Sequence, residues 1–112
     1  MKNVLPAALF FALVTGFSAN SGAVTVKGME SCGVWVKSHA GRTSLSMNTV
    51  AQNAWLHGYL SGVAVARNID FLKGVDENAI QIWMNNYCSS HPSDLVGYAA
   101  DALSVELAKR MH

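Results

Sequence analysis

The sequence predicts an all-α protein: a small four-helix bundle pinned by one disulfide, after a cleaved signal peptide. Apolar residues recur at helical spacing in four segments, and the alternation typical of β-strands is nearly absent. A length of 112 residues suits one small domain. The two cysteines lie far apart in the sequence, so a bond between them would tie distant helices together.

The N-terminus has the pattern of a secretory signal peptide. Lys2 precedes an apolar run from Val4 to Val14, which is too short to cross a bilayer as a helix. Small residues ending at Ala23 suit cleavage by signal peptidase. We therefore expect removal of residues 1–23 and a single helical domain, residues 24–112, in the periplasm without a stable membrane anchor. The alternative is a membrane-anchored N-terminus or a buried first helix.

The charge balance argues against a nucleic-acid partner. Lys and Arg number 8, Asp and Glu number 7, and the formal net charge is +1. A protein that neutralises a run of phosphates needs an excess of positive charge. We therefore expect no nucleic-acid partner; the expected partner, for the reasons given below, is a protein.

Cys32 and Cys88 are the only cysteines of the chain. In an oxidising compartment they are expected to form a disulfide. Closing a loop of about 57 residues stabilises a fold by about 4 kcal/mol in the chain-entropy model. A metal pair or a reactive thiol is the alternative, but the four scattered histidines do not supply further ligands. No metal and no cofactor are expected.

The first helix is expected over about residues 29–39. Cys32, Trp35 and Val36 fall on one side of it, and Gly41 ends it. A small, polar connection follows.

The second and longest helix is expected from Asn48 to Asn68, with Asn48 or Thr49 as its N-cap. Its predicted apolar stripe is Val50, Trp55, Leu56, Tyr59, Leu60 and Val63. Gly58, Gly62 and Ala66 recur every four residues, and a helical glycine costs about 1 kcal/mol relative to alanine. We expect another helix backbone to approach this strip closely.

The third helix is expected over residues 77–89, with Asp76 as its N-cap. Its apolar face places Cys88 in the core, within reach of Cys32. The members of that face are Ile80, Trp83, Met84, Tyr87 and Cys88.

The fourth helix is expected to open at Pro92, with Ser90 or His91 as its cap, because proline suits the first turn of a helix. The side chains expected to face inward are Leu95, Val96, Ala99, Ala102, Leu103 and Leu107. Ser104 is expected to face outward.

The connection over residues 69–75 is the best candidate for a partner-binding surface. It carries two large apolar residues, Phe71 and Leu72, followed by Lys73. Exposed side chains of this kind anchor protein complexes. Phe71 or Leu72 plugging the end of the bundle is the alternative, because large apolar residues are mostly buried. We name Phe71, Leu72 and Lys73 as the candidate binding residues.

No residues of the sequence form a recognisable catalytic site. His57 and Ser61 lie one helical turn apart, but a nucleophile also needs an orienting third group and an oxyanion site. Trp35, Trp55 and Trp83 at helical spacing among aliphatic neighbours fit a core better than a ligand cage. We expect binding as the function, and no enzyme activity.

Three strings resemble the Rap/Tai-type immunity proteins in their order and spacing. They are Ser31–Trp35, Trp55–Gly62 and Trp83–Cys88, the last followed by His91 and Pro92. Members of this family are small periplasmic helical proteins that neutralise cell-wall amidase effectors delivered by type VI secretion.

This resemblance spans most of residues 31–107. It implies a helical fold with a Cys32–Cys88 bridge and inhibition by insertion of a loop into the amidase groove, and it allows a homodimer. The inserted residues do not carry over, because inhibitory loops differ between members.

A looser pattern is similar to the HdeA-type periplasmic acid-stress chaperones: a cysteine near the N-terminus, a Gly-Tyr helix, and a second cysteine before a proline. It implies an acid-activated holdase. At pH near 2, protonated carboxylates and histidines would give the mature chain a charge of about +12, a repulsion that loosens a bundle.

Overall fold

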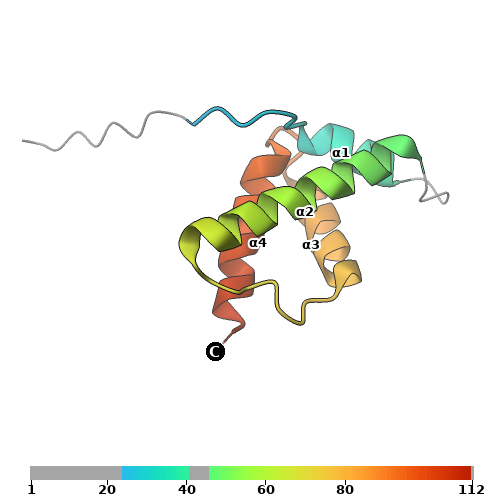
Figure 1. Ribbon diagram of the computed structural model, residues 1–112. Helices are drawn as coiled ribbons and strands as arrows, with labels where there is room; N and C mark the ends of the chain where they lie inside the picture. The colour runs from blue at the N-terminus through green and yellow to red at the C-terminus, as the bar shows by residue number, and fades with distance from the viewer. Residues whose placement is uncertain (1–23, 41–45, 112) are drawn as a thin grey trace, which may run out of the picture.

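The computed structural model describes residues 24–40 and 46–111, and these form a four-helix, all-α domain, which confirms the predicted fold class. The helices are α1 (Cys32–His39), α2 (Met47–Arg67), α3 (Glu77–Ser90) and α4 (Val96–Lys109). In Figure 1, α3 runs upward and α4 runs back down to the C-terminus, α2 crosses the bundle, and α1 lies at its upper end. The predicted signal peptide, residues 1–23, lies outside the described residues.

The core draws on all four helices and on the connection between α2 and α3. Its largest fully buried side chains are Trp35, Phe71, Leu56, Leu60, Met84 and Leu103. Burying a side chain of this size contributes about 1.5–3 kcal/mol. On α2 the buried positions are Thr49, Gln52, Leu56 and Leu60. Val50, expected on this face, is 50% exposed.

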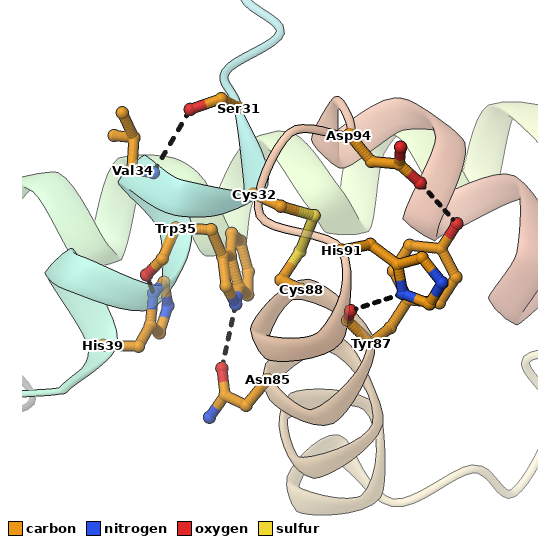
Figure 2. Close-up of a disulfide and its surroundings, with 10 residues drawn as sticks. All are labelled: Ser31, Cys32, Val34, Trp35, His39, Asn85, Tyr87, Cys88, His91 and Asp94. Atoms are coloured by element: carbon orange, nitrogen blue, oxygen red, sulfur yellow. Dashed lines mark hydrogen bonds between the residues drawn. A yellow bond between two sulfur atoms is a disulfide. The ribbon is translucent and has the colours of Figure 1, made fainter.

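The Cys32–Cys88 disulfide is confirmed, and it ties the start of α1 to the last turns of α3. Both cysteines are fully buried. Beside them, the indole Nε1 of Trp35 donates a hydrogen bond to Asn85 Oδ1 at 2.8 Å, so α1 and α3 are joined by a polar contact as well (Figure 2).

Backbone hydrogen bonds join the N-terminal turn of α1 to the segment before α4, and this contact is called the clip below. The amides of Cys32 and Gly33 donate to the carbonyls of Asp94 (2.7 Å) and Pro92 (3.0 Å), and the amide of Val96 donates to the carbonyl of Glu30 (2.8 Å). The first amides of a helix have no partner inside it, so they need acceptors from elsewhere.

This clip explains why the predicted start of α4 is wrong. The helix begins at Val96 rather than at Pro92, and its N-cap, Leu95, makes no side-chain cap bond. The carbonyls of Pro92 and Asp94 accept from α1 instead of from a turn of their own helix. A proline signal for a helix start was therefore overridden by a contact with a distant segment.

The helix boundaries on either side of the 69–75 connection are close to those predicted. Helix α2 ends at Arg67, and its C-cap is Asn68, which has a left-handed backbone (φ 53°) and an amide that donates to the carbonyls of Ala64 and Val65. Helix α3 begins after Asp76, which accepts from the amide of Asn78, as predicted for its N-cap. At its other end, α2 starts at Met47, one residue earlier than expected, and the predicted N-cap of Asn48 or Thr49 is wrong. The N-cap is Ser46, whose side chain accepts from the amide of Thr49.

Two predictions about helix faces are wrong. In the described parts of the chain, a Cβ built at Gly58 or Gly62 meets no atom of another helix within 4 Å, so no other described helix packs closely on these two glycines. Ser104 is fully buried rather than exposed. Its hydroxyl donates to the carbonyl of Asp101 (2.6 Å) and accepts from Arg67 Nη1 (3.2 Å), so both of its bonding roles are filled in the interior.

Candidate functional site

The three candidate binding residues differ in how far the structure buries them. Phe71 is only 1% exposed and belongs to the core, as the alternative interpretation of a plug allowed. It is therefore not available to a partner. Leu72 packs half-buried against the core, and Lys73 is exposed.

The backbone from Phe71 to Val75, called the ridge below, is held in a defined shape. The amide of Lys73 donates to the carbonyl of Asp70 (3.4 Å), and that of Val75 to the carbonyl of Leu72 (3.1 Å). Gly74 supplies the left-handed conformation (φ 71°) within the second of these turns. With Phe71 seated in the core, the ridge is fixed at both the backbone and the side-chain level.

Figure 1 shows the connection running from the end of α2 to the start of α3, at the end of the bundle where α4 also finishes. The ridge lies between two hollows. The first, of about 240 Å³, is lined by His57, Leu60, Ser61, Leu72, Val75, Glu77 and Ile80. The second, of about 280 Å³, is lined by Phe71, Lys73, Val75, Asp76, Ala79, Leu107, Arg110 and Met111. Val75 lines both, so the ridge forms their common wall.

Charged groups mark the rims of both hollows. His57 Nε2 lies 2.6 Å from Glu77 Oε1 at the first, and exposed pairs of this kind contribute little to stability. At the second, Arg110 pairs with Glu106 at 3.3 Å. No ion pair within residues 24–40 and 46–111 engages Lys73, so its ammonium is open to a partner's carboxylate.

His57 and Ser61 both line the first hollow, but the histidine pairs with Glu77. Within the described parts of the chain, no group of three or more His, Cys, Asp or Glu side chains could hold a metal ion. Among these same residues, no helix combines the length and the apolar character needed to cross a membrane.

Sequence reasoning found the ridge but missed its surroundings. Leu107 and Arg110 line the second hollow because the end of α4 lies beside the connection. No local sequence pattern predicts that these two segments come together. Of the three tryptophans, Trp35 is fully buried, as expected of a core residue, whereas Trp55 and Trp83 are half-buried.

The fold and this geometry define a class: a disulfide-bonded, all-α four-helix domain with an anchored ridge between two hollows. Comparisons with protein-family models, curated proteins and solved structures find no match for this chain. Function therefore has to be argued from the residues and their arrangement.

Proposed function

We propose that this protein is an exported, immunity-type inhibitor that binds a cell-wall amidase effector and blocks its cleft with the ridge. The resemblance of three strings to the Rap/Tai-type proteins supports the class of partner. The buried disulfide supports an oxidising compartment, and hence export to the periplasm.

One observation supports the role proposed for the ridge. Its exposed residues, Lys73 and Gly74, directly follow Phe71 and Leu72 in the chain, and the side chain of Phe71 is buried in the core. Inserting a flexible loop into a cleft costs free energy, because its side chains and backbone lose their freedom on binding. The turns ending at Lys73 and Val75 and the burial of Phe71 remove part of that cost in advance. The proposal therefore gives Phe71 a positioning role.

The two hollows extend the proposed contact beyond the tip. Leu72 and Val75 supply apolar surface beside them, and Lys73 supplies a positive charge that no ion pair of the described residues engages. A cleft wall that fills either hollow with an apolar side chain and meets Lys73 with a carboxylate would match this surface in shape and charge.

The test is inhibition of an amidase encoded beside this gene. The purified protein should abolish hydrolysis of peptidoglycan peptides at a fixed molar ratio. Lys73→Glu should weaken inhibition about tenfold or more, because it reverses a charge at the contact. Lys37→Glu, an exposed lysine on α1, is the matched control and should inhibit like the parent protein. Absence of inhibition would overturn the proposal.

A second candidate function, an acid-activated holdase, is favoured by a different observation: carboxylates join separate parts of the fold. Tyr59 donates to Asp101 (2.9 Å), linking α2 to α4, and Tyr87 donates to Asp94 (2.8 Å). Protonation of carboxylates in acid weakens such charge-assisted bonds and leaves the chain strongly positive.

This candidate is tested by aggregation of an acid-sensitive client protein. Suppression at pH 2–3 that disappears near pH 7 would support the holdase, and equal behaviour at both values would exclude it. Asp94→Asn and Asp101→Asn should raise the pH at which suppression begins, because each removes a carboxylate acceptor.

A further inference from the structure

A third hollow, of about 240 Å³, is lined by none of the ridge residues. It lies where the segment before α1 passes over the first half of α2. Its lining residues are Gly28, Glu30, Trp35, Asn48, Ala51, Gln52, Trp55 and Val96. We call it the Trp55 pocket. Its exposed lining residues, among them Glu30, Asn48 and Ala51, open it to the surface.

The amide of Gln52 is the unusual group in this pocket. Gln52 is 9% exposed, and its Nε2 donates to Glu30 Oε2 (2.5 Å) and to Ser38 Oγ (3.2 Å). These two bonds fix the orientation of the amide, because a carboxylate oxygen accepts and cannot donate. The other amide atom, Oε1, is buried and has no hydrogen-bond partner among residues 24–40 and 46–111. Buried polar atoms of native proteins are nearly always bonded, so this acceptor points to a missing donor.

The charge around the pocket specifies what kind of donor is missing. Glu30 contributes a carboxylate and Gln52 an amide oxygen, and no basic side chain belongs to the described lining. Two acceptors, one of them negatively charged, favour a positively charged group that carries several N–H bonds.

The indole of Trp55 is held in place as an apolar wall. Its Nε1 donates to the carbonyl of Lys27 (2.9 Å), and its ring stacks on Tyr59 with centroids 5.1 Å apart. Gly28, with φ 76°, lets the chain pass close to this ring, since a Cβ there would lie 3.1 Å from the indole. An aromatic ring of this kind also attracts cations.

We propose that the Trp55 pocket binds a small primary alkylammonium compound. The ammonium bonds Glu30 and the free Oε1 of Gln52, and the short alkyl chain lies against Trp55 and Val96. The volume lies below the usual range of about 300–1,000 Å³ for drug-sized ligands, so the pocket takes a short chain rather than a large molecule.

The probe is n-butylammonium chloride, with 1-butanol as its neutral match of the same chain length. Titration of the full protein is followed by tryptophan fluorescence and by the NMR signals of the three indole N–H groups. We expect saturable binding of butylammonium that moves the Trp55 signal, and affinity for butanol at least about tenfold lower. No saturation with butylammonium, or equal binding of the two probes, would overturn the proposal.

Two variants assign the binding to the named acceptors. Glu30→Gln should weaken butylammonium binding about tenfold or more, because it removes the charge and keeps the shape. Glu106→Gln, which neutralises a carboxylate on α4 outside the pocket, is the matched control and should bind like the parent. Gln52→Met should also weaken binding, and if that variant does not fold, Glu30→Gln decides alone. Unchanged affinity in Glu30→Gln would overturn the assignment.

Discussion

Replacing Phe71 with alanine tests whether this side chain anchors the ridge in the core. Phe71 is 1% exposed and is among the largest fully buried side chains. Truncating a buried Phe to Ala costs about 3–5 kcal/mol, because transfer free energy is lost and a cavity remains. A domain of this size has a total stability of roughly 5–13 kcal/mol, so the change removes a large part of it. In a domain of 60–100 residues, each kcal/mol lowers the Tm by about 4–8 °C, so this loss lowers it by about 12–40 °C.

The assay is thermal and urea unfolding followed by circular dichroism. Leu72→Ala, in the adjacent half-buried residue, should cost about 1 kcal/mol, and Lys73→Ala should stay within about 0.5 kcal/mol of the parent. A Tm for Phe71→Ala within about 5 °C of the parent would refute the reasoning. It would mean that Phe71 does not fill the core and that the ridge is not anchored.

Three further results are expected. Reducing the Cys32–Cys88 disulfide should lower the free energy of unfolding by about 4 kcal/mol in the chain-entropy model. Urea unfolding with and without reductant measures this loss. Before reduction, alkylation should label neither cysteine. The pKa of Tyr59 is raised to about 12, mainly by burial and to a smaller extent by the hydrogen bond to Asp101. Its contribution to stability is complete below pH 10 and is lost as the pH rises through 12, because the unfolded chain releases this proton first; Asp101→Asn should lower that pKa in a spectrophotometric titration. Gly58→Ala should stabilise the protein by up to about 1 kcal/mol, because its Cβ meets open space on a helix; a destabilised variant would contradict that packing.

Much of the fold could be predicted because its determinants are local. Helical spacing places Cys32 and Cys88 on the inner faces of their helices, and Asp76 caps the helix that follows it. The start of α4 could not be predicted in this way. Its position depends on carbonyls of Pro92 and Asp94 that accept bonds from α1, which is distant in the sequence.

The candidate sites were predictable only in part. The apolar pair in the longest connection identified the ridge, but adjacent residues in a turn point in different directions. The sequence therefore could not decide that Phe71 is buried while Lys73 is exposed. The Trp55 pocket gave no sequence signal, because it forms only where Gly28 and Glu30 pass over Gln52.

The most direct test of the ridge as the binding surface is hydrogen–deuterium exchange of the protein with and without its amidase partner. We predict that binding slows exchange of the amides from Phe71 to Val75 and leaves the amides of α1 unchanged. Protection confined to α1 or to the exposed face of α2, with the ridge exchanging at its free rate, would contradict the account.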